Sequence, residues 1–332
     1  NNPVTEDTVY YLTDRNIGIK LPGLFIPPDM HNKGNYATSL ASLCRWLGEK
    51  AEELGVMLFP GFAASEVLYN EDGSVKGVAT GDMGISVSGE QKPTYQPGYE
   101  LHAKYTVFAE GTRGHLGKQL MEKFDLCKDS ETQHYALGFK EVLEIDPEKH
   151  TPGKVMHTIG WPLGHFPGGS NGGSFLYHLE DNQVALGLII NLDYSNPHLS
   201  PFDEFQQYKH HKIIKKYLEG GKRVAYGARA LVKGGLSALP KPIMPGGIIV
   251  GDDAGFLNII KQKGTHTAIK SGTLAAEAVY EAIKGGSTGG EELTSFVENF
   301  EASWLYEELH RGRNTTAWMH KFGLLIGSAA VW

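Results

Sequence analysis

The sequence predicts a mixed α/β fold, in which an α/β domain of the nucleotide-binding type is interrupted by an inserted antiparallel sheet. Two observations lead to this class. Between residues 36 and 124, a helix, a strand, a hairpin, a strand, a glycine turn and a helix follow one another. Between residues 135 and 192, short apolar runs are separated by Gly, Pro and Asn, as is typical of an antiparallel sheet.

The composition is that of an ordinary globular protein. The chain has 332 residues, of which 41% are hydrophobic and 21% charged. Its net charge of −7 argues against nucleic acid as a partner. Only two cysteines are present, Cys44 and Cys127, so the sequence predicts neither a disulfide framework nor a cysteine metal site.

Residues 1–133 are predicted to form the first part of the α/β domain. One face of a helix that ends at Gly55 carries the apolar residues Leu40, Leu43, Leu47, Ala51 and Leu54. The stretch "VMLFPG" at 56–61 is typical of a strand. Two hairpins follow, one with its turn at 71–74 and one within 85–100. A further strand should end in Ala109-Glu110-Gly111, with a helix from about Gly114.

Residues 134–240 are predicted to form the antiparallel sheet. Its expected strands are "ALGFKEVLEI", "KVMHTIGWPL", "GGSFLYHLE" and "QVALGLIINL". One helix is expected over "SPFDEFQQYKHHKIIKKYLEGG", with its cap near Ser200. The basic cluster at 209–216 is either a solvated helix face or a contact for a partner or a lipid head group.

Residues 241–300 should return to the α/β domain. A strand at 248–250 is followed by Gly251 and Asp252, and a helix begins near Thr265. A carboxylate at the carboxyl end of a strand can accept hydrogen bonds from sugar or ribityl hydroxyls. A helix start offers free N–H groups to phosphate or to a flavin edge. The alternative is a capped helix after a buried strand, with solvated acids. Together with the turn "VFAEGTRG", the pattern favours a flavin site.

Residues 301–332 are predicted to form a C-terminal helix and the start of a membrane-contact segment. Residues 322–332 are apolar except for Gly and Ser, but a membrane span needs roughly 20 residues. The segment could lie in the membrane interface, belong to a longer apolar run or form a core helix. Because the chain also begins in polar sequence without an initiator Met, we expect it to be a piece of a longer protein.

Several long strings resemble one known family. They are "VFAEGTRGHLGKQL", "HTIGWPL", "GGSFLYHLE", "ALGLIINLDYSNPHLSPFDEFQQYKHH", "LEGGKRVAYGARAL" and "GFLNIIKQKGTHTAIKSGTLAAEA", and together they are similar to the electron transfer flavoprotein–ubiquinone oxidoreductase family. The likeness runs from "PVTED" to about residue 314. It implies a FAD/NAD(P)-binding Rossmann-like domain with an inserted ubiquinone-binding sheet domain at 134–240.

The resemblance also implies an activity. Such a protein accepts electrons from reduced electron transfer flavoprotein, in fatty acid β-oxidation, and passes them through FAD to ubiquinone in the respiratory chain. It would be peripheral on the inner membrane, on the mitochondrial matrix side or the bacterial cytoplasmic side. The apolar loop "KLPGLFIPPDMHNKGNY" at 20–36 would contact the membrane surface, or else it folds against the core.

The resemblance assigns roles to individual positions. Ala109, Glu110 and Gly111 would line the adenosine side of FAD, and Gly251 and Asp252 would meet its ribityl-phosphate region. The residues that would approach the isoalloxazine ring are Asn258, Gly264, Thr265, His266 and Thr267. Gly172 and Gly173 would offer backbone groups to a quinone carbonyl, although the residues alone favour a hairpin bulge there.

Two features of the family have no counterpart in this sequence. The GxGxxG loop that cradles the FAD pyrophosphate is missing, and two cysteines cannot ligate the family's [4Fe–4S] cluster. We therefore expect the cluster in a C-terminal part outside this chain. Electron transfer needs no catalytic side chain, so none is predicted. His115, His178 and His266 are taken as structural, with His266 the best exception because it lies in the proposed flavin turn.

Two other functions remain open. One is a FAD-dependent prenyl reductase or hydroxylase of the same superfamily, which shares the Gly-Asp and Ala-Glu-Gly turns. It would need a large apolar substrate cavity and a nicotinamide site. The other is a non-catalytic piece that binds only lipid, because the pyrophosphate loop is absent from this chain.

Overall fold

The computed structural model describes residues 2–164, 171–315, 317–318 and 321. The chain divides into two compact units. The first contains the described residues of 2–58 and 134–231, and the second contains 59–133 and 232–315. This division differs from the predicted boundaries, which placed residues 1–58 in the α/β domain. The predicted segment at 322–332 lies outside the described residues.

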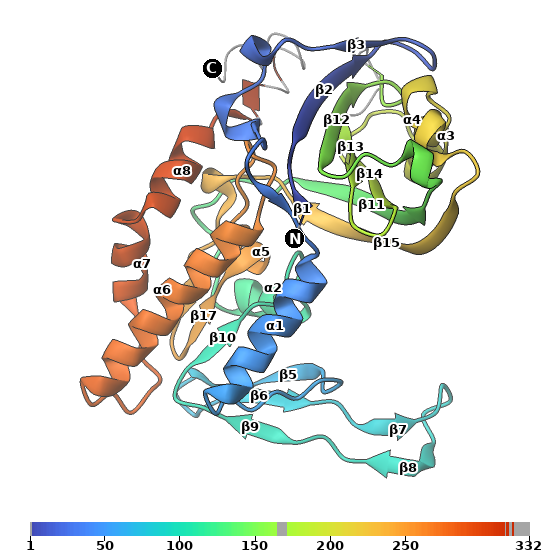
Figure 1. Ribbon diagram of the computed structural model, residues 1–332. Coiled ribbons are helices and arrows are strands. Elements are labelled where there is room, and N and C mark those ends of the chain that lie inside the picture. Colours follow the sequence, from blue (N-terminus) through green and yellow to red (C-terminus); the bar gives the residue numbers. More distant parts are fainter. Residues whose placement is uncertain (1, 165–170, 316, 319–320, 322–332) are drawn as a thin grey trace. The chain divides into compact units, whose positions relative to one another are not determined.

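A seven-stranded sheet forms the body of the first unit (Figure 1). Its strands, in spatial order, are β15 (Lys222–Val232), β11 (Tyr135–Glu144), β14 (Gln183–Asn191), β13 (Gly172–His178), β12 (Lys154–Gly160), β2 (Glu6–Leu12) and β3 (Gly18–Lys20). The ladder from β11 through β14 and β13 to β12 is antiparallel, as predicted. Strand β2 pairs with β12 in parallel, which explains why the N-terminal residues join this unit.

Two short helices pack against this sheet, where the sequence predicts one. They are α3 (Pro201–Lys209) and α4 (Lys212–Leu218), and the predicted cap at Ser200 is confirmed. The helix is interrupted at His211. The imidazole Nδ1 of this residue accepts a hydrogen bond from the Ile213 amide and so caps α4. Phe205 and Tyr208 are buried against the sheet. Phe202, in the first turn of α3, is 57% exposed.

The N-terminal segment contains short elements and one longer helix. The short elements are β1 (Asn2–Pro3), β4 (Tyr36–Ala37) and the 3-10 turns η1 (Gly23–Phe25) and η2 (Pro28–Met30). The helix is α1 (Leu40–Glu53), capped by Ser39 and followed by Gly55 at φ +86°, as predicted. Its apolar face is not buried, however, because Leu40 and Leu47 are 52% and 43% exposed.

Short strands build the second unit. The central group is β10 (Thr106–Phe108), β17 (Gly247–Ile249) and β16 (Ile243–Met244), in which β10 and β17 are parallel. The predicted hairpins are confirmed as β5 (Ala64–Tyr69) with β6 (Val75–Thr80), and β7 (Met83–Ile85) with β8 (Gln91–Gln96). Strand β9 (Glu100–His102) pairs with β6. The predicted strand at 56–61 is wrong, since these residues form coil and turn.

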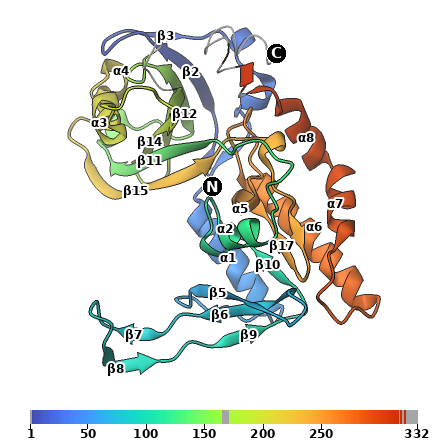
Figure 2. The same cartoon turned by 180° about the vertical axis from the view of Figure 1, so that it is seen from behind.

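Helices complete the second unit (Figure 2). They are α2 (His115–Lys123), α5 (Gly251–Ala254), α6 (Thr265–Lys284), α7 (Thr294–Glu301) and α8 (Trp304–Gly312). The helix starts near Gly114 and Thr265 are confirmed. Apolar side chains of α2, α6, α7 and α8 share one core with β10 and β17. Within the described ranges, no helix is both long enough and apolar enough to cross a membrane.

Candidate functional site

The carboxyl ends of β10 and β17 bring the two predicted ligand turns together. The strands are parallel and in register, with Phe108 opposite Ile249. The Val250 amide then donates to the Phe108 carbonyl at 2.9 Å. The turn at 109–111 and the turn at 250–252 therefore leave the sheet at the same edge, which is where open α/β sheets bind ligands.

Asp252 lies beside the start of α6. A Cβ added to Gly264 would lie 2.9 Å from Asp252 Oδ1, so only glycine lets the carboxylate approach this turn. Gly251 has φ +61°, a conformation that favours glycine, and its amide donates to buried Ser271 Oγ at 3.0 Å. Gly264 occupies the N-cap of α6 and has no side chain to accept from the first helical amides. The Asp252 carboxylate therefore lies close to the positively polarised N-terminus of α6.

Glu110 and Asp253 lie on the α2 side of the same edge. Glu110 Oε2 accepts hydrogen bonds from the Leu116 and Gly117 amides, both at 2.8 Å, so its carboxylate serves the first turn of α2. Asp253 is 5% exposed, and its Oδ2 accepts from the Glu110 amide at 3.4 Å. A Cβ on Gly114 or Gly117 would lie 2.3 or 2.4 Å from Asp253 Oδ1.

The environment of Asp253 disfavours its charge. Burial is the largest cause, and the neighbouring Glu110 carboxylate adds to it, although hydrogen bonds from the backbone of Glu110 and Gly114 partly offset both. The pKa of Asp253 is raised to about 6 as a result. The sequence indicated Asp252 for this edge but not Asp253, which faces the other helix.

The two threonines of the predicted flavin turn, Thr265 and Thr267, differ in exposure and in the hydrogen bonds of their hydroxyls. Thr265 is exposed at the first position of α6. Thr267 is fully buried, and its hydroxyl lies 2.7 Å from the Gly264 carbonyl oxygen and also within hydrogen-bond reach of the Phe256 carbonyl. The Thr267 hydroxyl therefore stabilises the turn itself, and of the two threonines only Thr265 remains as the predicted donor to a ligand.

Asn258 and His266 meet at a carboxylate that sequence analysis missed. Glu308 Oε1 accepts from Asn258 Nδ2 at 2.6 Å and lies 2.5 Å from His266 Nε2. Glu308 Oε2 accepts from Lys261 Nζ at 2.7 Å. The loop between β17 and α6 is closed by a bridge in which the amides of Asn258 and Lys263 each donate to the other residue's carbonyl.

Glu308 is buried and ionised. Burial by itself would raise its pKa, but the hydrogen bonds from Lys261, His266 and Asn258 outweigh burial and lower the pKa to about 2. The sequence carried one signal for this residue. The buried stripe of α8 comprises Leu305, Glu308, Leu309 and Gly312, and a carboxylate in such an apolar register needs a partner.

Gly172 and Gly173 begin strand β13 in the first unit. They pair with Ile190 and Ile189 of β14 in regular register, without a shift that would mark a bulge. A Cβ on Gly172 would lie 2.1 Å from the Ile189 carbonyl oxygen, whereas a Cβ on Gly173 would have its nearest neighbour at 3.4 Å. Gly172 is therefore required by packing, whereas a Cβ on Gly173 would make only ordinary van der Waals contacts, with Thr158 and Ile159.

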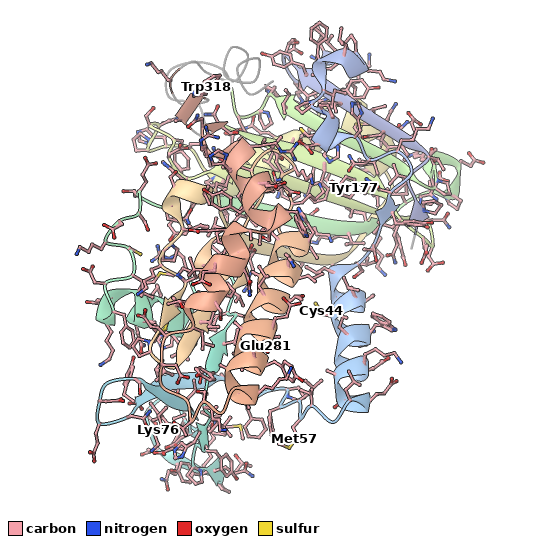
Figure 3. The ribbon with its side chains drawn as sticks, turned by 90° about the vertical axis from the view of Figure 1, so that its left-hand side faces the viewer. Cys44, Met57, Lys76, Tyr177, Glu281 and Trp318 are labelled. Carbon is pink, nitrogen blue, oxygen red and sulfur yellow. The ribbon has the colours of Figure 1, made fainter. Side chains whose placement is uncertain are left out.

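Polar side chains follow Gly173 along the sheet. Tyr177 lies on the same strand (Figure 3), and its hydroxyl is 2.7 Å from His157 Nε2 on β12. His157 Nδ1 lies 3.9 Å from Asp7 Oδ1 on β2. His178, held as structural, is fully buried and accepts from the Thr151 amide, and burial lowers its pKa to about 4. His115 is exposed on α2.

Comparison with known proteins finds close relatives of this chain. A family model described as "ETF-QO, ubiquinone-binding" matches residues 135–231, which are the strands β11 to β15 with their helices. The electron transfer flavoprotein–ubiquinone oxidoreductase of Pseudomonas aeruginosa is 58% identical over 330 residues, 99% of this chain and 59% of the relative. Over 99% of its length, the chain is similar to an electron transfer flavoprotein–ubiquinone oxidoreductase. The resemblance inferred from the sequence is thereby confirmed.

The family reaches into eukaryotes. The mitochondrial protein of the same name from Rattus norvegicus is 52% identical over 322 residues, 95% of this chain and 51% of the relative. The chain thus spans less than two thirds of the length of these curated relatives.

Solved structures show a similar fold. A geranylgeranyl bacteriochlorophyll reductase-like protein from Thermoplasma acidophilum aligns with TM-score 0.67 at 16% identity, covering 99% of this chain and 73% of that protein. A probable FAD-dependent monooxygenase from Pseudomonas aeruginosa aligns with TM-score 0.52 at 13% identity, covering 98% and 80%. At such identities the likeness concerns the fold alone, and it confirms the predicted mixed α/β class.

Proposed function

We propose that the protein to which this chain belongs transfers electrons from reduced electron transfer flavoprotein to ubiquinone through FAD. The observation that carries the proposal is the match of residues 135–231 to the ubiquinone-binding family model. The names of the curated relatives supply the electron donor and acceptor.

The sheet edge in the second unit has features that suit FAD. Asp252 can accept hydrogen bonds from ribityl hydroxyls, and the amides at the start of α6 can meet an electron-rich group. The space that a Cβ would fill at Gly264 lies between them. The turn at 109–111 would contact the adenosine side through its backbone, because the Glu110 carboxylate is held by α2.

Within this proposal the chain's residues bind and orient the cofactor, and FAD supplies the electron-carrying chemistry when bound. Asn258 is held in one orientation, since its Nδ2 donates to Glu308 and its Oδ1 accepts from the Lys261 amide at 2.8 Å. Thr265 and His266 present the first backbone amides of α6 to the isoalloxazine ring. None of these roles requires an acid–base side chain.

The glycine pair of β13 is the proposed quinone contact. Where Gly173 has no side chain, a flat quinone ring could reach the strand's backbone groups, and Gly172 keeps the strand close to β14. The family model that covers these residues carries the ubiquinone-binding description, which favours this use over a purely structural one.

We also propose that the protein is peripheral on a membrane surface. Leu24 and Phe25 are 81% and 66% exposed in the turn η1, between Pro22 and Pro27. Exposed apolar side chains of this kind favour contact with lipid. A [4Fe–4S] cluster would be held elsewhere in the whole protein, because this chain has only two cysteines.

The test uses the purified full-length protein. We expect a flavin absorbance band, bleaching of that band by reduced electron transfer flavoprotein, and its return when ubiquinone is added. Rapid bleaching by NADH or NADPH, with no response to electron transfer flavoprotein, would instead favour a prenyl reductase or hydroxylase. A colourless protein that binds vesicles would favour the lipid-binding alternative.

A further inference from the structure

Three donors from one loop and one helix start converge on the buried carboxylate of Glu308. Asn258 Nδ2, Lys261 Nζ and His266 Nε2 lie 2.6, 2.7 and 2.5 Å from its oxygens. The donors belong to the segment that carries the proposed isoalloxazine contacts, whereas the acceptor lies on α8, 42 residues beyond His266. A helix distant in sequence therefore holds the proposed cofactor turn.

The contact with Glu308 determines the protonation pattern of His266. An ionised carboxylate can only accept hydrogen bonds, so the His266 nitrogen that faces it must carry a hydrogen. That nitrogen is Nε2. The His266 ring also stacks on Trp304, with ring centroids 5.9 Å apart and planes 6° apart, so it cannot turn without losing both contacts. In the neutral ring, Nδ1 is then the nitrogen without a hydrogen.

The cluster also balances charge. Glu308 carries a negative charge beside the positive Lys261 ammonium group, and the Glu308 side chain is only 9% exposed. Neutralising Glu308 would remove a buried negative charge from beside the Lys261 ammonium group and the turn. Reduction of a nearby cofactor adds electrons, and a less negative surrounding would favour it.

We propose that Glu308 is a positioning residue for the cofactor turn: it holds Asn258, Lys261 and His266 in one arrangement and fixes the His266 hydrogen on Nε2. This inference rests on the proposed function, because it gives Glu308 a role toward the bound flavin. Glu308 performs this role without changing its own protonation state, because its carboxylate stays charged throughout the neutral range.

The experiment combines a spectroscopic and an electrochemical measurement on the full-length holoprotein. ¹⁵N NMR of labelled histidines, assigned with His266→Gln, reports which ring nitrogen of His266 carries hydrogen, and redox titration reports the flavin midpoint potential. In the wild type we expect hydrogen on Nε2. Glu308→Gln should retain flavin but no longer hold the hydrogen on Nε2 alone, because a neutral amide can either accept from or donate to that nitrogen, and it should shift the potential upward.

Two variants serve as controls. Glu307→Gln makes the same chemical change at the exposed neighbouring position of α8 and should alter neither measurement. Glu308→Asp keeps the negative charge, and should keep the hydrogen on Nε2 and the potential close to wild type. A potential that Glu308→Asp and Glu308→Gln shift equally would show that only the shape of the side chain matters, against the proposal.

Other outcomes also decide the matter. Wild-type His266 with hydrogen on Nδ1 would overturn the proposal, even if Glu308→Gln failed to fold. An unchanged tautomer and potential in a folded Glu308→Gln protein would do the same. Failure of the proposed function looks different: the wild-type protein would then contain no flavin, while the His266 tautomer in the folded protein would still test the role of Glu308.

Discussion

The Asp252 carboxylate lies directly against Gly264, where an added Cβ would be 2.9 Å from Oδ1. This approach joins Asp252 of α5 to the N-cap of α6, although eleven residues separate the two positions in sequence. A carboxylate that can accept from hydroxyls therefore lies beside a helix start whose N-cap residue, Gly264, provides no side-chain cap. The first prediction depends on this contact between Asp252 and the start of α6.

Asp252→Ala should weaken flavin retention. Hydrogen bonds to a charged group contribute about 1.5–3 kcal/mol each, so loss of one or two should weaken FAD binding about tenfold or more. The measurement is the flavin-to-protein ratio of full-length protein after extended dialysis. Asp129→Ala, at an exposed carboxylate of the same unit, should leave the ratio unchanged. Equal flavin content in Asp252→Ala and wild type would contradict the site assignment.

Substitutions at the two glycines of β13 should have different effects, one on protein stability and the other on the reaction with quinone. Gly172→Ala should destabilise the protein by about 1–3 kcal/mol, because its Cβ would lie 2.1 Å from the Ile189 carbonyl oxygen. Gly173→Ala should fold normally, since its Cβ meets no atom closer than 3.4 Å, but should slow reoxidation of the flavin by ubiquinone. Denaturant unfolding and quinone kinetics are the two measurements. Normal quinone kinetics in Gly173→Ala would argue against the assigned contact.

Asp253 should make the stability depend on pH. Its pKa rises from 3.8 to about 6 on folding, so its contribution is fully present below pH 3.8 and is lost as pH rises through about 6. The loss amounts to about 3 kcal/mol. Asp253→Asn should therefore be more stable than wild type at pH 7, with a flatter stability profile between pH 4 and 6. Denaturant unfolding at several pH values is the measurement, and parallel profiles would contradict the shifted pKa.

The η1 turn should contribute to membrane association. Replacing both Leu24 and Phe25 by Ser should weaken binding to phospholipid vesicles at least tenfold, because two exposed apolar side chains would no longer leave water. Vesicle co-sedimentation is the measurement, and thermal melting should be unchanged. Leu54→Ser is a matched control, since Leu54 is 85% exposed but lies after α1. Equal losses in the two proteins would show that the effect is not specific to the turn.

Local patterns predicted many of the elements, and their failures have a common cause. The stretch at 56–61 has the composition of a strand, but a strand also needs a neighbour that offers free N–H and C=O groups, and no described strand pairs with it. The apolar stripe of α1 correctly predicts a helix. Whether that stripe becomes buried depends on a surface from another part of the protein, and here Leu40 stays 52% exposed.

The candidate cofactor site shows the same limit. The turns at 109–111 and 250–252 could be expected at one sheet edge, because each follows an apolar strand. Glu308 could not be assigned to them, since nothing in the order of residues along α8 specifies which loop its carboxylate meets. Likewise, the sequence alone does not show that the adjacent residues Asp252 and Asp253 lie in different environments, because the two residues are of the same type.

By itself, the sequence determined the resemblance to one family, the mixed α/β class, the antiparallel ladder from β11 to β14 and the helix starts at Gly114 and Gly264, because each depends on a local pattern or on a long shared string. Only the tertiary structure decided that β2 joins the seven-stranded sheet, that Glu110 serves α2, that Thr267 faces inward and that Glu308 holds His266. These relationships are made between residues far apart in the chain, and they depend on backbone register and burial, which exist only once the chain has folded.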